Sequence, residues 1–290
     1  MPSLAWIVQE AMLNSILKKR ILIPDKVSEL TIYAPHIAAK ARPGNFVVIR
    51  LTATGERIPL TIADKNPEKG TIVIVYLVLG KTTALLDTFK EKDVILDLCG
   101  PLGKPTEIRT LGEVVCVGGG TGIAAMHHIA KGNYEAGNSV ISIIGARSRD
   151  LLLFKPELET ISSRVLVATD DGTLGHKGFV TEVLEKYLQD SDAVKEVVAV
   201  GPVPMMKAVA SVTAPFKVNT VVSLNSIMVD GIGMCGACRV SVGGETRFAC
   251  VDGPEFEASK VDFDELMSRL GAFREQEKKS MELFTAGRFS

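Results

Sequence analysis

The chain has 290 residues, 46% of them hydrophobic, and a formal net charge of -1 at pH 7. This length accommodates two domains and a small additional segment. The near-zero charge gives no reason to expect nucleic acid or an anionic membrane as a partner. The sequence shows neither an apolar run of the ~20 residues that span a bilayer nor a signal peptide. Five cysteines, three of them clustered, indicate metal ligands in a reducing cytoplasm rather than a disulfide scaffold.

The first third of the chain reads as short strands separated by turns. Strands are predicted at 30–33, 46–51 and 72–77, which are rich in β-branched residues. Such a series is typical of a small antiparallel β-barrel. A helix is expected over 83–89, and its N-terminus, after Gly80-Lys81-Thr82, would suit a phosphate group.

The middle third alternates strands and helices. An apolar strand at 113–117 runs into a glycine-rich turn, and a helix begins after it; the turn reads Gly118, Gly119, Gly120, Thr121, Gly122. In this context small residues let the backbone approach a dinucleotide, and the helix N-terminus favours its negative charge. Further strands at 140–144, 165–168 and 197–200 predict a parallel, doubly wound sheet.

Three more turns follow the ends of these strands, and the carboxyl edge where they gather is where ligands bind in such sheets. The candidate NAD residues in them are Arg147, Asp170, Asp171, Gly172, Gly201, Pro202 and Met205. The choice between NAD and NADP stays open. No acidic residue follows the strand at 140–144, and Arg147 and Arg149 are either 2′-phosphate ligands or solvated side chains.

The last third contains the cysteine cluster. Cys235 and Cys238 form a C-x2-C pair, and Cys250 follows after eleven intervening residues. This fits the C-x4-C-x2-C…C spacing of plant-type [2Fe–2S] clusters, except that Asp230 occupies the first position. Asp230 is either a carboxylate ligand to iron or part of a turn. A structural zinc is disfavoured, because zinc sites usually show two close ligand pairs.

Other residues able to carry chemistry show no shared pattern. His36, His127, His128 and His176 are expected to be structural or exposed, and Cys116 and Cys99 to be buried free thiols, with Cys99 as the rival cluster ligand. An amphipathic helix is expected over 262–272, followed by a polar stretch that either packs on a neighbour or is solvated.

A short motif in the first third resembles the R-x-P/Y-x-S/T signature of the ferredoxin–NADP reductase superfamily, whose barrel binds FAD. The resemblance implies that Arg57 meets the FAD phosphates and that Pro59, Leu60 and Thr61 line the isoalloxazine. It places Tyr76 and Leu77 on the other side of the flavin, and Gly80, Thr82 and Thr83 at the pyrophosphate. Relatives often have a second glycine where this chain has Thr82.

Over nearly its whole length the chain resembles the electron-transfer subunits of bacterial dihydroorotate dehydrogenase. It is closer still to the small subunits of NADH-dependent reduced ferredoxin:NADP oxidoreductase, since those carry aspartate and the former cysteine at the position of Asp230. The implied fold is α/β plus all-β: an antiparallel FAD-binding β-barrel at 1–103, a doubly wound NAD-binding domain at 104–222, a [2Fe–2S] cluster segment at 223–253, and a helical tail at 254–290.

The resemblance also implies a function. The chain would move electrons between NAD(H), FAD and a [2Fe–2S] cluster held by Asp230, Cys235, Cys238 and Cys250. Its partner would be a large glutamate-synthase-like subunit with FAD and [4Fe–4S] clusters, which bifurcates electrons and through which ferredoxin is reached. Two alternatives stay open: a subunit of dihydroorotate dehydrogenase or of sulfide dehydrogenase, and a non-enzymatic redox sensor.

Overall fold

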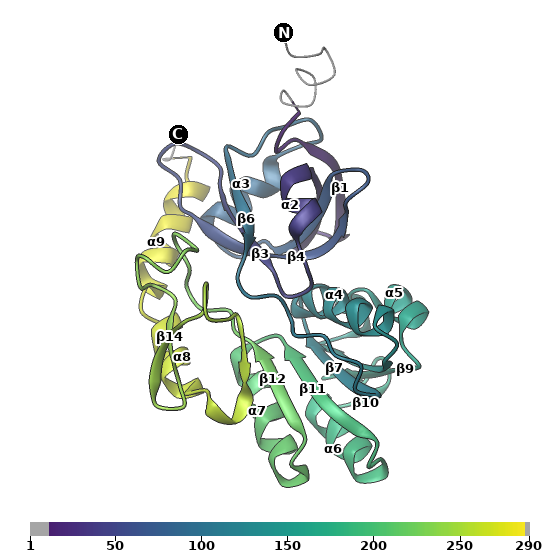
Figure 1. Cartoon of the computed structure of the whole chain (residues 1–290). Helices are drawn as coiled ribbons and strands as arrows, with labels where there is room; N and C mark the ends of the chain where they lie inside the picture. Colours follow the sequence, from purple (N-terminus) through teal and green to yellow (C-terminus); the bar gives the residue numbers. More distant parts are fainter. Residues whose placement is uncertain (1–11, 288–290) are drawn as a thin grey trace.

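The computed structural model describes residues 12–287, so expectations for 1–11 and 288–290 lie outside the described residues. The described chain forms two large sheets and a C-terminal segment. Figure 1 shows the first sheet curled above the second, with the C-terminal segment along one side of both. The fold predicted from the sequence, an antiparallel barrel beside a parallel sheet, is confirmed.

The first sheet is antiparallel throughout and has the order β1-β2-β5-β4-β3-β6. Its strands are β1 (Ile16–Ile23), β2 (Val27–Tyr33), β3 (Phe46–Arg50), β4 (Ile58–Asn66), β5 (Thr71–Leu77) and β6 (Asp97–Leu102). Its two edges approach each other where Ser15 pairs with Val94 and Ile16 N donates to Asp93 O at 2.9 Å. Isoleucine, leucine and valine side chains of β1 to β5 fill the core, and Leu98 of β6 packs against it.

Two helices accompany this barrel, α2 (Pro35–Lys40) and α3 (Lys81–Thr88). The helix predicted at 83–89 therefore begins two residues earlier, directly after Gly80. Thr83 Oγ1 accepts the N–H of Gly80 at 3.1 Å and closes the first turn.

The second sheet has the order β10-β9-β8-β7-β11-β12-β15, and every pairing is parallel except β12 with β15. Its strands are β7 (Glu113–Gly119), β8 (Ser139–Ala146), β9 (Arg164–Thr169), β10 (His176–Lys177), β11 (Val194–Val200), β12 (Asn219–Ser223) and β15 (Glu255–Glu257). The strand order reverses direction between β7 and β11. The carboxyl ends of those two strands therefore form the switch point where such sheets bind ligands.

Helices cover both faces of this sheet, as the doubly wound prediction requires. One face carries α4 (Gly122–Glu135) and α5 (Lys155–Ile161); the other carries α6 (Val180–Asp190) and α7 (Val203–Thr213). Alternate residues of one strand enter different cores: Val115 and Val117 pack towards α6 and α7, and Val114 and Cys116 towards α4.

The C-terminal segment packs on the rest of the chain. It contains the hairpin β13 (Arg239–Val242) and β14 (Glu245–Phe248), then β15 and the helices α8 (Phe263–Leu270) and α9 (Arg274–Thr285). Helix α8 contacts α7 and β13, and α9 contacts α3. Because β15 pairs with β12, a stretch predicted to be tail supplies an edge strand of the second sheet. The bounds of the four predicted domains and segments stay predictions.

Two sequence expectations concern single thiols and the membrane. Cys116 is fully buried as predicted, and burial raises its pKa to about 12. The prediction of a buried Cys99 is wrong: this thiol is exposed, because β6 is the last strand in the sheet order. None of the helices in residues 12–287 is long and apolar enough to cross a membrane.

Candidate functional site

The glycine-rich turn after β7 touches the turn after β11. A Cβ on Gly122 would lie 2.5 Å from Val200 O and 2.7 Å from the Cα of Gly201, and a Cβ on Gly119 would lie 2.4 Å from the sulfur of Met205. Only glycine permits so close an approach of the two strand ends. Gly120 has φ +55 and open space beside its Cα, which leaves room for a group to lie against the backbone there.

Main-chain hydrogen bonds join the remaining turns at this edge. Gly120 N donates to Gly145 O at 3.0 Å, and Asp171 N donates to Arg147 O at 3.2 Å. The four predicted turns therefore gather at one edge. Arg147, Asp170 and Asp171 are exposed there. The Asp171 carboxylate accepts from the hydroxyl (2.7 Å) and the N–H (2.9 Å) of Thr173, and these hydrogen bonds lower its pKa.

The R-x-P-x-T motif occupies the start of β4. Arg57 is exposed, and its Nη2 lies 4.0 Å from Asp97 Oδ2, which also accepts from Arg50 Nε at 2.5 Å. Pro59, Leu60 and Thr61 are half-buried and pair with β3. The sequence analysis missed Asp97, although it lies in the strand that pairs with Arg50.

A second missed residue, Glu56, joins the motif to helix α3. Its carboxylate accepts from Thr82 Oγ1 at 2.7 Å and lies 3.5 Å from Lys81 Nζ. The hydroxyl of Thr82 thus points towards Glu56. Gly80 has open space beside its Cα, so the N-terminus of α3 is accessible to a phosphate group. The sequence signal that could have identified Glu56 is its position directly before Arg57.

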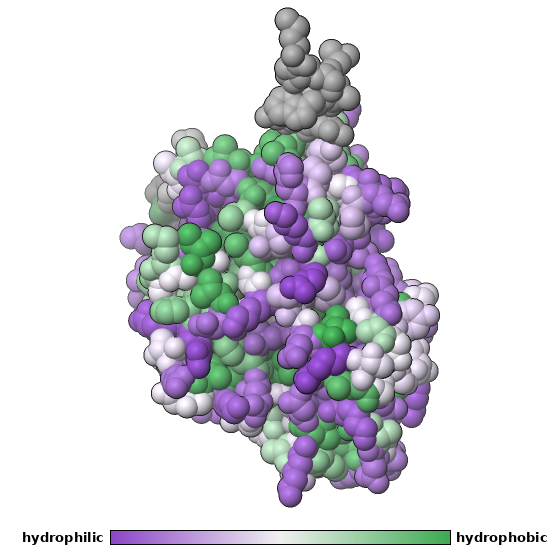
Figure 2. Space-filling model, in the orientation of Figure 1, coloured by the Kyte–Doolittle hydropathy of each residue, from purple (hydrophilic) through white to green (hydrophobic). Residues whose placement is uncertain are grey.

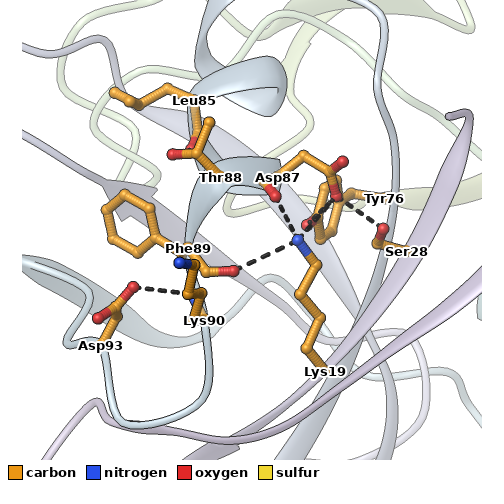
Figure 3. Close-up of polar contacts among 9 residues, drawn as sticks. All are labelled: Lys19, Ser28, Tyr76, Leu85, Asp87, Thr88, Phe89, Lys90 and Asp93. Carbon is orange, nitrogen blue, oxygen red and sulfur yellow. Dashed lines mark hydrogen bonds and ion pairs between the residues drawn. The ribbon is translucent and has the colours of Figure 1, made fainter.

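Tyr76 and Leu77 point in different directions. Tyr76 is 2% exposed and donates its hydroxyl to Asp87 Oδ1 at 3.0 Å, so its side chain lies in the barrel core, whereas Leu77 is exposed. Figure 3 shows Asp87 between Tyr76, Ser28 and Lys19. Burial and the neighbouring Asp87 raise the pKa of Tyr76. Only the main chain of Tyr76 is therefore available for the predicted contact with the flavin.

The loop that carries the cysteines turns through three glycines with positive φ: Gly231, Gly233 and Gly236. Asp230 shapes this loop, since Oδ1 accepts from Ile232 N at 2.9 Å and Oδ2 from Cys235 N at 2.6 Å. These main-chain donors lower the pKa of Asp230. A Cβ on Gly231 would lie 2.6 Å from Leu102 of β6 and 3.0 Å from Val48 of β3, so the loop packs directly on the barrel.

The four candidate ligands form two pairs. The sulfurs of Cys238 and Cys250 are 3.1 Å apart and buried, while Asp230 and Cys235 are joined at the surface by their hydrogen bond. Within residues 12–287 no three His, Cys, Asp or Glu side chains stand close enough to share a single metal ion. The hydrogen bond to Asp230 comes from the main-chain N–H of Cys235, so only the Cys238 and Cys250 sulfurs are brought together as ligand atoms.

Exposed apolar side chains flank the exposed Cys235 along the chain. Val229, Ile232, Met234 and Val251 are exposed, Met234 at 81%. Figure 2 shows hydrophobic groups gathered on the side of the molecule that carries the C-terminal segment. Such a cluster on a protein surface marks an interaction site.

The fold and these sites define the class of protein: a flavin-type reductase barrel joined to a nucleotide sheet and a cysteine-bearing segment. Residues 116–211 match the oxidoreductase NAD-binding domain, and residues 225–262 match the iron-sulfur cluster binding domain of dihydroorotate dehydrogenase B. A solved ferredoxin NADP+ reductase from Neisseria gonorrhoeae with bound FAD and NADP shares this fold at 15% identity, with a TM-score of 0.56 over 70% of this chain and 90% of that one.

Curated relatives are much closer. A dihydroorotate dehydrogenase B (NAD(+)) electron transfer subunit homolog of Thermotoga maritima is 51% identical over 95% of this chain and 97% of its own length. The electron transfer subunit of Bacillus caldolyticus is 33% identical over 83% and 94%. The chain belongs to this family of dihydroorotate dehydrogenase B electron transfer subunits and their homologues.

A solved structure is as close. A chain of the NADH-dependent reduced ferredoxin-NADP oxidoreductase, studied for flavin-based electron bifurcation, is 50% identical, with a TM-score of 0.89 over 94% of this chain and 98% of that one. The chain is therefore an oxidoreductase-type electron-transfer subunit, with FAD, an iron–sulfur cluster and NAD as its cofactors, and it acts with a larger catalytic subunit.

Proposed function

We propose that the chain is the small subunit of an electron-bifurcating NADH-dependent reduced ferredoxin:NADP oxidoreductase. The observation that carries this is the likeness to the chain of that enzyme, 50% identical with a TM-score of 0.89, together with the aspartate at position 230. When bound, the flavin would exchange a hydride with nicotinamide and single electrons with the cluster, so it would have to lie between them.

For the cluster, we assign Asp230 and Cys235 to one iron of a [2Fe–2S] centre and Cys238 and Cys250 to the other. The support is the C-x4-C-x2-C…C spacing with Asp230 at the first position, the closeness of the Cys238 and Cys250 sulfurs, and the positive-φ glycines of the loop, which let main-chain N–H groups face an anionic centre. The packing of Gly231 against β3 and β6 brings this loop onto the flavin barrel.

For the nucleotides, we assign residues of this chain to binding and orienting FAD and NAD(H). Arg57 and the N-terminus of α3 hold the FAD phosphates, and Pro59, Leu60 and Thr61 lie along the isoalloxazine, with the main chain of Tyr76 and with Leu77 opposite. The turns at 118–122 and 201–205 hold the nicotinamide half of NAD(H), and the turns with Arg147 and Asp170 its adenosine half. The support is the direct contact of Gly122 with Gly201 and the open space at Gly80 and Gly120.

We assign the exposed apolar rim of Val229, Ile232, Met234 and Val251 to the docking surface of the large subunit, a glutamate-synthase-like protein with FAD and [4Fe–4S] clusters. Ile232 and Met234 lie within three residues of Cys235, so docking there would bring the partner next to the cluster. All five cysteines are free, which suits the cytoplasm, where we place the complex.

The test is anaerobic purification of the chain from its native cells with whatever binds it. We expect a large subunit with [4Fe–4S] clusters, and NADH should bleach the flavin and then reduce a [2Fe–2S] cluster visible by EPR. Recovery of a colourless chain would refute the proposal.

A second candidate is the electron transfer subunit of dihydroorotate dehydrogenase, favoured by the match of residues 225–262 to the cluster domain of that enzyme. In that case the same purification yields a barrel enzyme with FMN, and dihydroorotate bleaches the FAD of this chain.

A further inference from the structure

One face of helix α4 forms a seam with the barrel. His128, Lys131 and Gly132 are three and four positions apart, so they share that face. His128 Nδ1 lies 2.8 Å from Ile62 O, Lys131 Nζ lies 2.8 Å from Asp64 Oδ1, and a Cβ on Gly132 would lie 2.9 Å from Pro43 Cγ. We call this set of contacts the α4–β4 seam.

The central contact of the seam is a buried hydrogen bond. His128 is 4% exposed, and burial lowers its pKa, so the ring is neutral at pH 7. A neutral imidazole has one N–H, and a carbonyl oxygen only accepts, so Nδ1 carries the proton and donates it to Ile62. Without that donor, the Ile62 carbonyl would lose its partner from α4.

An open groove of about 480 Å³ lies beside the seam, lined by Asp64, His127, Lys131 and Glu157 among others. His127 is buried there, and its Nδ1 has no hydrogen-bond partner among the described residues. The hydrogen bond of His128 and the ion pair of Lys131 add directional polar contacts to the packing of α4 on β4 and so help to fix how the two elements sit.

Both elements of the seam lead directly into a cofactor site. Ile62 follows Thr61, the last residue of the flavin motif on β4. Helix α4 begins at Gly122, the last residue of the glycine-rich turn, and His128 lies six positions further on, roughly 9 Å along the helix. A shift of α4 against β4 therefore moves the nicotinamide turn against the flavin strand by a similar amount.

We propose that His128 is a positioning residue for hydride transfer: its bond to Ile62, with the Lys131–Asp64 ion pair, holds the nicotinamide turn in register with the flavin strand. This rests on the proposed function. In the step concerned, the hydride leaves nicotinamide C4, NADH becomes NAD+, and flavin N5 takes the hydride with both electrons. Such transfers lose about a hundredfold in rate for a misplacement of roughly 1 Å.

The experiment compares His128→Leu with His128→Asn in the holoprotein, because leucine fills the site without a donor whereas the asparagine amide nitrogen replaces Nδ1. His36→Leu is the matched control, since His36 is exposed on α2. Three quantities are measured anaerobically: the limiting rate of flavin reduction by NADH, the charge-transfer absorbance with NAD(H), and amide hydrogen exchange over 58–66 and 122–135.

We expect His128→Leu to reduce its flavin about tenfold more slowly or worse, with a weakened charge-transfer band, faster exchange at the seam, and unchanged FAD and iron content. His128→Asn and His36→Leu should stay within about threefold of the wild type. A wild-type rate and exchange in His128→Leu would overturn the proposal, as would a His128→Asn variant as slow as His128→Leu.

The failure of the proposed function looks different. If NADH does not bleach the flavin of the wild-type protein, the proposed function is refuted. Hydrogen exchange alone then tests whether His128 holds α4 against β4. Faster exchange in His128→Leu but not in His128→Asn then supports it, and equal exchange in the three proteins overturns it.

Discussion

Asp230 is oriented by its own loop. Its two carboxylate oxygens accept the N–H groups of Ile232 and Cys235, and the second of these is itself a candidate ligand. The same hydrogen bonds also exist in a turn without metal, so they do not by themselves separate the two interpretations of Asp230. To distinguish the two interpretations, Asp230 must be replaced by a residue that binds iron differently or not at all.

The first prediction makes that change. Asp230→Cys should retain the cluster but lower its reduction potential, on the order of tens of millivolts, because thiolate donates more electron density than carboxylate. Asp230→Ala should lose most of its iron. Iron content and an EPR-monitored redox titration measure both. An intact cluster of unshifted potential in the two variants would rule out ligation by Asp230.

The second prediction concerns Gly122. A methyl group there would collide with the main chain of Val200 and Gly201, so the two nucleotide turns must separate. Gly122→Ala should weaken NAD(H) binding about tenfold or more, equivalent to roughly 1.4 kcal/mol. Isothermal titration with NAD+ measures this, and FAD content serves as the internal control. Unchanged affinity would show that the turn does not bind the nucleotide.

Among individual site residues, those that belong to a local motif were predictable from the sequence, whereas those whose partners are distant in the chain were missed. Gly118 to Gly122 were recognisable because strand, turn and helix are contiguous. Glu56 acts on Thr82, 26 positions away, and His128 on Ile62, 66 positions away. No sequence pattern in either stretch predicts such contacts, since they form only when two elements pack together.

At the scale of elements, helix α3 is fastened at its C-terminal end. Lys19 of β1 bonds to the carbonyls of Asp87 and Phe89, and Ser28 and Tyr76 donate to the Asp87 carboxylate (Figure 3). The opposite end of the helix faces the proposed FAD phosphates. The network thus fixes the helix from strands β1, β2 and β5, away from the ligand.

The third prediction separates the two roles of Tyr76. Tyr76→Phe removes one hydrogen bond to Asp87, so the free energy of unfolding should fall by about 1 kcal/mol. The flavin absorbance spectrum and its reduction by NADH should not change, because the ring lies in the barrel core. Chemical denaturation and stopped-flow absorbance measure the two. An altered flavin spectrum would mean that the side chain contacts the isoalloxazine.

Elements with strong periodicity were predictable, whereas those fixed by tertiary contacts were not. The strands at 72–77 and 197–200 stand within one to three residues of β5 and β11. Strand β15 was missed, because three residues after Gly253-Pro254 carry no strand signal of their own and pair only once β12 is in place.

At the scale of the whole molecule, Glu255 lies where three parts meet. Its Oε1 accepts from Thr106 Oγ1 of the inter-sheet linker at 2.7 Å, and a Cβ on Gly44 of the barrel would lie 2.9 Å from the same atom. Loss of water contact, with the charge of Glu196, raises the pKa of Glu255 to about 7.

The fourth prediction follows from this raised pKa. Between pH 4.5 and about 7 the unfolded chain has lost the proton that the folded chain keeps, so stability falls as pH rises. Glu255→Gln removes this loss. The free energy of unfolding of the variant minus that of the wild type, from thermal denaturation, should increase from pH 5 to 7 and then level off, with an upper limit on the order of 3 kcal/mol.

The comparison with Glu255→Gln is needed because His127 and His128 change the stability in the opposite direction as pH rises. Burial lowers the pKa of both, so their contribution to stability is present at neutral pH and is lost as pH falls below 6.5. Subtracting the wild-type curve cancels that contribution. A flat difference curve would show that Glu255 is ionised in the folded protein.

The cysteine segment leaves and re-enters the second sheet at one place. Ser223 ends β12 opposite Glu255, which begins β15, and Leu224 N donates to Pro254 O at 2.9 Å. The two ends of the stretch between are thus already neighbours. A single insertion or deletion at this junction would add or remove the cysteine segment while β12 and β15 stay side by side.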